Sequence, residues 1–411
     1  MALLVTGCST AARTPSPVSS APVATAFAVT PTPRPAAALS PQMLTLWVAP
    51  AFAPDPATTA GALFSDRLQA FEADHAGLQL VVRVKAEKGP GGLAESISSA
   101  SQAAPSALPD LATLDPEGVR IAAMAGHLIS LQGLLPQPEP SEWYDFAFDA
   151  TNVDGRFYAL PFASDMEVFG YETGAFDSPP VDWASLFGDQ TSFLIPAADP
   201  DALFLFAQYL ALGGLPLDRA PLEPDLLAEA LGFLASAGES GALAPASLEF
   251  TSSGETWLAL QEGRAQAAQA PYAAFVASYA PDSHAAGPLP TRDGKGVSLA
   301  LSWSWVSVRS ERQAVAAELM AWLSDPAFLA EWTYSLGLVP SQPQVLARWP
   351  DSPEAAIASR LVPTALARPN SQVLEIAGPV LQTALRATLR GELIPSEAAG
   401  QAAEALAGLL P

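Results

Sequence analysis

Short apolar runs alternate with helical spacings over residues 43–126. Runs of strand length lie at Met43–Val48, Leu78–Val84 and Leu111–Leu114. Between the first two, Phe64, Leu68 and Phe71 fall at i, i+4 and i+7, which is the spacing of one helix face. Helical stretches follow the other two runs, at 93–101 and 118–125. The alternation predicts β-α-β-α-β-α and a mostly parallel sheet with helices on both faces.

The pattern continues as a second α/β block and a helical C-terminal third. After a tight turn at Asp154-Gly155, strands are predicted at Arg156–Phe162, Glu167–Tyr171, Ser192–Ile195 and Gly296–Val308. Helices are predicted at Asp201–Leu212, Leu226–Ala237, Ala314–Leu323, Ala327–Tyr334, 376–389 and Ala398–Leu410. The sequence Ser252-x-x-Glu255 predicts a capping box that opens another helix.

Residues 9–42 are Ser, Thr, Ala and Pro almost throughout, with Thr30-Pro31-Thr32-Pro33-Arg34-Pro35 at the centre. Such a stretch has too little apolar area to offset its ordering entropy, and proline stiffens it toward polyproline II. We expect a disordered stalk.

Cys8 is the only cysteine, and Leu4-Val5-Thr6-Gly7-Cys8 has the form of a bacterial lipobox. Its thiol would carry a thioether-linked diacylglycerol. We therefore expect residues 1–8 to be a signal remnant with its lipobox, and the rest of the chain to work outside the cytoplasm, anchored to the membrane. Because Met1–Val5 supply no basic residue and only a fragment of an apolar region, we expect the native start to lie upstream of Met1.

Composition limits the protein class. A chain of 411 residues, 50% of them hydrophobic, favours two domains or lobes. Its apolar runs fall short of the ~20 residues that a spanning helix needs. A net charge of −23 excludes nucleic acid and anionic lipid head groups as partners.

Motifs for catalysis and cofactors are absent from the sequence. His75, His127 and His284 are isolated, so we expect no metal site and no cofactor. Gly89–Gly92 lacks the lysine that follows a phosphate-binding loop, and a plain loop is the simpler interpretation. Asp199 and Asp201 lie at a predicted helix start, where carboxylates complement the helix dipole.

Aromatic side chains are frequent at the ends of predicted segments, namely Trp47, Trp143, Tyr144, Tyr272, Trp303, Trp305, Trp332 and Tyr334. A sugar has apolar C–H faces and a hydroxyl rim, which suit flat rings and carboxylate acceptors. For each ring, core packing and ligand contact both remain open.

The order of several short motifs resembles the large maltose-type, sugar-binding family of extracellular solute-binding proteins of ABC importers. The most specific is Asp154-Gly155-Arg156-Phe157-Tyr158-Ala159-Leu160-Pro161-Phe162, close to the family's "D-G-K-x-Y-(G/A)-L-P". The others are Met43–Trp47, Phe71-x-x-x-His75-x-Gly77-Leu78, Pro109-Asp110-Leu111, Leu258–Ala265, Gly287-Pro288-Leu289-Pro290, Trp303–Val308 and Leu338-Val339-Pro340. The resemblance covers residues 43–411.

The resemblance implies an α/β, two-lobed periplasmic-binding-protein-like fold of type II, with the ligand cleft between the lobes and crossing hinge segments. Lobe one would comprise 43–163 plus 290–338, and lobe two 164–289 plus 339–411. It also implies a monomer that takes a small-molecule solute, most simply a carbohydrate, to ABC permease subunits, without enzymatic activity.

The resemblance carries six ligand-binding residues onto matching motifs, namely Trp47, Asp115, Asp165, Tyr272, Trp303 and Trp305. Four positions depart from the family. Ser302 and Ser304 replace usual glycines, Tyr272 replaces a usual Trp, and Glu172 stands where Asn is usual.

Two alternatives remain open from the residues alone. The acidity and the aromatic rings also suit a polyamine or another non-sugar solute, through cation–π contact. A surface glycosidase would need two carboxylates about 5–10 Å apart across a cleft, which a sequence cannot show.

Overall fold

The computed structural model describes residues 42–176, 179–188, 191–309 and 311–409. Pro41–Pro411 form one compact unit. The lipobox at Cys8 and the predicted stalk lie outside the described residues, except that Gln42 begins the first strand.

The first third of this unit alternates strands and helices as the hydrophobic pattern predicted. Its elements are β1 (Gln42–Val48), α1 (Thr59–Asp74), β2 (Leu78–Val84), α2 (Leu93–Ala103), β3 (Leu111–Leu114) and α3 (Pro116–Met124). The next are α4 (Asp145–Phe148), β4 (Asn152–Val153), β5 (Arg156–Phe157) and β6 (Ala159–Glu172). Asp154 and Gly155 both have positive φ in the predicted turn between β4 and β5.

The middle of the chain and its C-terminal third complete the unit. The middle holds β7 (Phe193–Leu194), α5 (Leu203–Ala211), α6 (Pro224–Ser240), α7 (Ser253–Gln261), β8 (Ala267–Pro271), α8 (Tyr272–Ala277) and β9 (His284–Gly287). The rest is β10 (Ser298–Ser307), α9 (Gln313–Leu323), α10 (Pro326–Leu336), β11 (Val339–Pro340), α11 (Pro343–Leu346), α12 (Pro353–Leu361), β12 (Ala365–Ala367), α13 (Ser371–Leu389) and α14 (Pro395–Leu406).

One sheet runs through the unit in the order β2-β1-β3-β10-β6-β8-β7. β1 pairs in parallel with β2 and β3, as the alternation predicted. β10 is antiparallel to β3, and β6 is antiparallel to both β10 and β8. β7 pairs in parallel with β8, and β12 with β10. The sheet is therefore mixed, and its two long strands β6 and β10 depart from the expected mostly parallel arrangement.

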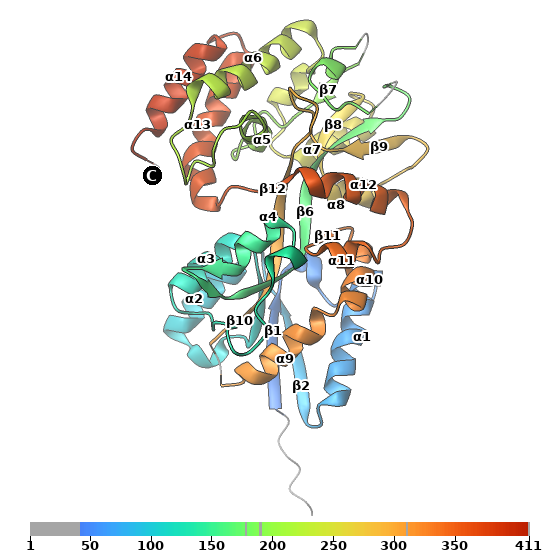
Figure 1. Ribbon diagram of the computed structural model, residues 1–411, viewed down its shortest axis with the longest axis vertical. Helices are drawn as coiled ribbons and strands as arrows, with labels where there is room; N and C mark the ends of the chain where they lie inside the picture. Colours follow the sequence, from blue (N-terminus) through green and yellow to red (C-terminus); the bar gives the residue numbers. More distant parts are fainter. Residues whose placement is uncertain (1–41, 177–178, 189–190, 310, 410–411) are drawn as a thin grey trace, which may run out of the picture. The chain divides into compact units, whose positions relative to one another are not determined.

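β6 and β10 run through both lobes of this unit (Figure 1). The two strand segments predicted at 156–162 and 167–171 are largely one strand, β6, of 14 residues. Along β6, Phe162 belongs to one hydrophobic core and Phe169 to a second. Along β10, Trp303 belongs to the first core and Leu299 to the second. Both cores are thus built on the same two strands.

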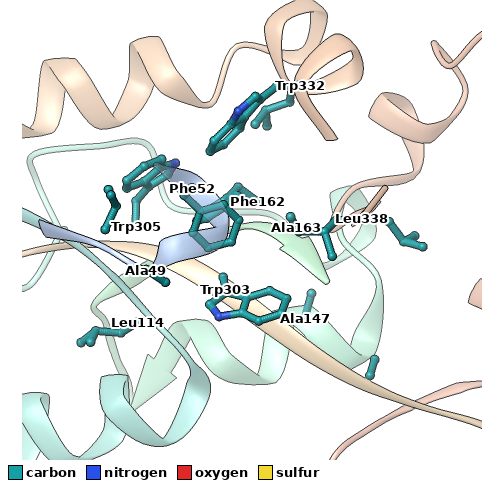
Figure 2. Packing of buried hydrophobic residues seen from close by; sticks show 14 of the residues in the cluster. Ala49, Phe52, Leu114, Ala147, Phe162, Ala163, Trp303, Trp305, Trp332 and Leu338 are labelled. Atoms are coloured by element: carbon teal, nitrogen blue, oxygen red, sulfur yellow. The ribbon is translucent and has the colours of Figure 1, made fainter. Parts of the chain in front are cut away.

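The first core is dense in aromatic rings. Phe162 stacks on Trp305 and Trp332 with centroids 4.8 and 5.4 Å apart. Figure 2 shows these rings with Phe52 and Trp303 in one cluster. Phe52 meets Trp303 edge-on at 5.6 Å. Aromatic pairs in such geometries stabilise a core by more than their buried area alone.

The second core lies under α5, α6, α13 and α14. The three long helices α6, α13 and α14 pack on one another (Figure 1). α5 carries the nearly continuous apolar run Leu203-Phe204-Leu205-Phe206-Ala207, which is buried along its length. A helix that is apolar all round is typical of the interior of a protein. The predicted assignment of residue ranges to the two lobes stays a prediction.

Candidate ligand site

A cavity of about 580 Å³ opens beside the two long strands β6 and β10. Its walls come from β6, β10, the segment before α5, the start of α7 and the loop after β2. The lining residues are Glu87, Asp165, Met166, Glu167, Asp199, Pro200, Asp201, Leu203, Thr251, Ser252, Ser253, Gly254, Pro271, Leu299, Leu301, Trp303 and Arg368. A concave site with a few convergent polar groups is the usual form of a small-molecule site.

Asp165 and Glu167 reach the cavity from the same face of β6, because side chains at i and i+2 of a strand share a face. The backbone N–H groups of Met166 and Ala273 donate to Asp165 Oδ1 at 2.8 and 3.0 Å. Ser253 Oγ donates to Glu167 Oε1 at 3.1 Å, and Gln269 Nε2 donates to Glu167 Oε2 at 2.8 Å. Both carboxyls are therefore held in place by neutral donors.

Burial raises the pKa of Asp165 to about 6 and that of Glu167 to about 7. The cause is the cost of holding a charge away from bulk water. The hydrogen bonds that each carboxyl accepts favour the ionised form and offset part of this rise. The charge of Asp165 adds to the rise in the pKa of Glu167. Both groups thus titrate closer to neutral pH than ordinary carboxyls do.

Asp199 and Asp201 reach the cavity from the turn that precedes α5. Asp199 accepts from the N–H groups of Asp201 and Leu203, both at 3.0 Å, and so caps the start of the helix. Burial raises the pKa of Asp199. Asp201 forms an ion pair with Arg368, which follows β12. The helix-start role is confirmed for Asp199, and both aspartates line the cavity as well.

Trp303 and Glu87 close the cavity on another side. Trp303 Nε1 donates to Glu87 Oε1 at 2.9 Å. The Trp303 ring is 8% exposed and rests on Phe52, so it presents a fixed flat surface beside carboxylate acceptors. A flat ring next to hydrogen-bond acceptors suits the apolar face and the hydroxyl rim of a sugar.

The N-terminus of α7 forms the predicted capping box at the cavity wall. Ser252 Oγ accepts from the Glu255 N–H at 3.3 Å, and Glu255 Oε2 accepts from the Thr251 N–H at 2.6 Å. These bonds satisfy backbone donors that a helix start would otherwise leave open. The box fixes the position of Ser253, which in turn holds Glu167.

Of the six residues predicted to contact ligand, Asp165 and Trp303 line this cavity together. The other four lie elsewhere in the structure. Trp47 is 3% exposed, with Lys85 Nζ 4.6 Å from the centre of its ring. Asp115 caps α3 by accepting from the Gly118 N–H at 2.7 Å, and lies 3.7 Å from Lys88 Nζ.

Tyr272 and Trp305 are fully buried. Tyr272 Oη donates to the Glu354 carbonyl at 3.0 Å, and burial raises the pKa of its phenol. Trp305 stacks within the aromatic cluster on Phe162 and Phe64. Both side chains therefore support the core behind the cavity.

Five charged residues that line the cavity were not predicted as site residues from the sequence, namely Glu87, Glu167, Asp199, Asp201 and Arg368. Glu167 could have been found, because it stands two residues after Asp165 on a predicted strand. Arg368 follows a short strand that pairs with β10, and no local pattern marks that pairing.

A second open cavity of about 650 Å³ shares Leu301 and Arg368 with the first. Two of its other charged residues, Arg120 and Arg219, are partnered by Glu117 and Asp149. Neither Asp165 nor Trp303 lines it, and we therefore take the first cavity as the candidate site. Among the residues that the structure describes, no cluster of metal ligands is found, and no helix is long and apolar enough to cross a membrane.

Comparison with known proteins identifies the family. The profile of the bacterial extracellular solute-binding proteins matches residues 66–358, and the chain belongs to this family. Its members are binding proteins that work outside the cytoplasm. A comparison with curated protein sequences finds no match.

Solved structures with the same fold include three sugar-binding proteins. The cyclic α-maltosyl-1,6-maltose binding protein of Arthrobacter globiformis has a TM-score of 0.71 at 18% identity, covering 89% of this chain and 98% of that one. The maltose-binding protein MalE of Listeria monocytogenes, in complex with maltose, has a TM-score of 0.70 at 14% identity, covering 89% of this chain and 97% of that one. An ABC transporter solute-binding protein of Thermotoga lettingae, bound with α-D-tagatose, has a TM-score of 0.66 at 20% identity, covering 88% of this chain and 98% of that one. These matches confirm the expected two-lobed fold.

Proposed function

We propose that this chain is the solute-binding component of an ABC importer and that it captures a sugar or oligosaccharide in the cavity around Asp165 and Trp303. The observation that carries the proposal is the combination, in one cavity, of a fixed indole ring and carboxylate acceptors. The sugars named for the structural neighbours favour the same ligand class.

Closure of the two lobes would deliver the solute. The cavity draws residues from both cores, with Trp303 in the first and Leu203 in the second. A ligand that contacts both walls binds best when the walls approach, so it shifts the population toward a closed state. The permease would then accept the closed, loaded form of a monomer.

A thermal-shift and tryptophan-fluorescence screen against mono- and oligosaccharides tests the sugar assignment. A sugar at 100 times its dissociation constant stabilises the fold by about 2.7 kcal/mol, which raises Tm. The proposal fails if no carbohydrate of a broad panel raises Tm. Sugars should also be recovered unchanged after incubation, because the site is proposed to bind and not to hydrolyse.

The location of the site is tested by a pair of aspartate variants. Asp165→Asn should weaken binding of the sugar found in the screen, because it removes an acceptor in the cavity. Asp149→Asn is the matched control, since Asp149 lines the other cavity. Loss of binding in the Asp149 variant alone would move the site to that second cavity.

We also propose that Cys8 carries the lipid anchor and that residues 9–42 form the stalk. The support is the sequence Leu4-Val5-Thr6-Gly7-Cys8 and the Ser, Thr, Ala and Pro that follow. Labelling of the native protein with a fatty-acid analogue should modify it, and Cys8→Ser should abolish the label and release the protein from membranes. A labelled Cys8→Ser variant would contradict the anchor.

A further inference from the structure

The charges that line the cavity are strongly unbalanced. Five carboxyl groups face it, on Glu87, Asp165, Glu167, Asp199 and Asp201, with one guanidinium, on Arg368. That guanidinium forms its ion pair with Asp201. Four carboxyls are left without an ion pair among the described residues. The cavity therefore holds an excess of negative charge.

Neutral groups satisfy the hydrogen bonds of these four carboxyls without cancelling their charge. The donors are the backbone N–H groups at 166, 201, 203 and 273, the hydroxyl of Ser253, the amide of Gln269 and the indole of Trp303. The charge of Arg368 lowers the pKa of Glu167 and that of Asp199, but its effect on each is smaller than those of burial and of the hydrogen bonds. The protein therefore orients the carboxyls and compensates their charge only in part.

Gln269, which donates to Glu167, leaves one buried acceptor open. Its side chain is fully buried, and its amide nitrogen donates to Glu167. Its Oε1 atom has no hydrogen-bond partner in the part of the chain that the structure describes. A buried acceptor without a donor costs free energy, so Glu167 is held by a group that is itself not fully satisfied.

A neutral sugar needs acceptors for its hydroxyl groups, but it leaves such a charge excess in place. An ammonium group donates up to three hydrogen bonds and also supplies the missing positive charge. The Trp303 ring beside Glu87 suits both an apolar sugar face and a nearby cation. Among sugars, the cavity thus favours one with a basic nitrogen.

We propose that the solute is an amine-bearing sugar whose ammonium group lies between the carboxylates of Asp165 and Glu167. The inference rests on the proposed function, since it specifies the class of sugar bound at the same site. The sugar rings would lie along Trp303, and the remaining carboxylates would accept from hydroxyl groups.

Matched amine and neutral probes test this inference by calorimetry. The amines are glucosamine, galactosamine, mannosamine and β-1,4-linked glucosamine oligomers of two to six units. Each is paired with its N-acetylated form, and the monomers also with glucose, galactose and mannose. Maltose, maltotriose and spermidine complete the panel. We expect at least one amine to bind at least about tenfold more tightly than its N-acetylated partner.

A carboxylate variant locates the ammonium group. Glu167→Gln keeps the shape of the side chain and removes its charge, so it should weaken the amine by about tenfold or more while changing any neutral sugar by less than about threefold. Glu117→Gln is the control, because Glu117 lines the second cavity and pairs with Arg120. Equal losses for amine and neutral probes in the Glu167 variant would overturn the placement.

Proton release gives a readout that a structural role for Glu167 would not produce. The groups that face Asp165 and Glu167 are Glu87, Arg368 and the Tyr272 phenol, and of these only Arg368 is cationic at neutral pH. Because Glu167 has a pKa of about 7, an ammonium ligand should displace roughly half a proton at pH 7. Calorimetry in buffers of different ionisation enthalpy measures this number, and amine affinity should rise from pH 5.5 to about 7, below the range in which the amine itself loses its proton.

The outcomes separate this inference from the proposed function. If neutral sugars bind as tightly as their amines, the amine inference is wrong and the sugar-binding function stands. If spermidine alone binds, both the amine sugar and the sugar assignment are wrong. If no probe binds or shifts Tm, the inference is likewise overturned, together with the sugar assignment.

Discussion

Trp303 and Trp305 show how two residues of one type, two positions apart, take different roles. The period of a strand would place both on one face. However, the pairing of β10 with β6 shifts between Trp303 and Ser304, where Ala163 and Pro161 become the partners. The extra residue at this irregularity is Phe162 on β6, and its ring stacks on Trp305. Trp303 reaches the cavity wall, whereas Trp305 is enclosed among Phe162, Phe64 and Trp332.

The two tryptophans should therefore respond differently to truncation. Trp305→Ala removes a fully buried ring and should lower the free energy of unfolding by about 3–5 kcal/mol, measured by urea titration. Trp303→Ala should weaken ligand binding by about tenfold or more, because it removes the flat surface beside Glu87. A Trp303 variant that binds normally would place the ligand elsewhere.

Glu167 should make the unliganded protein less stable as pH rises. Burial raises its folded-state pKa to about 7, above the ordinary 4.5, so the folded state binds more protons than the unfolded state between these values. Its contribution is fully present below pH 4.5 and is lost as pH rises through about 7. Glu167→Gln should flatten this slope and gain about 1–3 kcal/mol of stability at pH 8, relative to wild type. Chemical denaturation at pH 5 and pH 8 measures the difference, and parallel pH profiles would contradict the buried charge.

Much of the candidate site depends on contacts that a sequence does not display. Asp165 was predicted because it follows the specific motif that ends at Phe162. Asp199 and Asp201 were recognised at a helix start, but their exposure to a cavity depends on where α5 packs. Glu87 meets Trp303 across 216 positions of sequence, and Arg368 meets Asp201 across 167. Pairings of this range follow from tertiary packing.

At the scale of the elements, local patterns predicted most helices and strands. The bounds of β2 match the predicted run Leu78–Val84, and Ser252 caps α7 as the capping box predicted. The joining of two predicted strands into β6 was not foreseen, because the polar residues Ser164 and Asp165 interrupt the apolar pattern. Ser164 forms a hydrogen bond of 2.8 Å with the buried Ser302, and Asp165 lines the cavity.

Helix α13 supports the cavity through a close contact at Gly378. A Cβ atom at this position would lie 2.3 Å from the Pro200 carbonyl oxygen and 2.9 Å from the Asp201 Cα. The backbone at Pro200 and Asp201 would have to shift to make room for the added methyl group. Gly378→Ala should therefore destabilise the fold by about 1–3 kcal/mol. It should also weaken ligand binding, because the displaced segment carries Asp199 and Asp201.

Gly232→Ala provides the matched control for this helix packing. Gly232 lies inside α6, and a Cβ atom there would have no neighbour within 4 Å. Alanine is the better helix former, so this variant should gain about 0.5–1 kcal/mol without a change in affinity. Urea titration and calorimetry on both variants separate packing from helix propensity. Equal effects of the two substitutions would contradict the role of the Gly378 contact.

At the scale of the whole folded unit, the shared strands should make unfolding cooperative. Both hydrophobic cores include side chains of β6 and β10, so neither core is complete without these strands. We expect Pro41–Pro411 to unfold in one calorimetric transition whose van't Hoff and calorimetric enthalpies agree. Two resolved transitions in the unliganded protein would show that the lobes are independent.

Ligand binding should bring the two walls of the cavity together. Glu95 on α2 follows the loop that carries Glu87, and Leu258 lies on α7, whose first turn forms the opposite wall. Spin labels on Glu95→Cys and Leu258→Cys, in a Cys8→Ser background, should move closer when the ligand found by screening is added, because closure satisfies both walls at once. A label pair at Asp74 and Glu95 lies on α1 and α2 beside the same strands, and its distance should not change. An unchanged Glu95–Leu258 distance at saturating ligand would mean that the solute binds a preformed site, and that the permease recognises something other than closure.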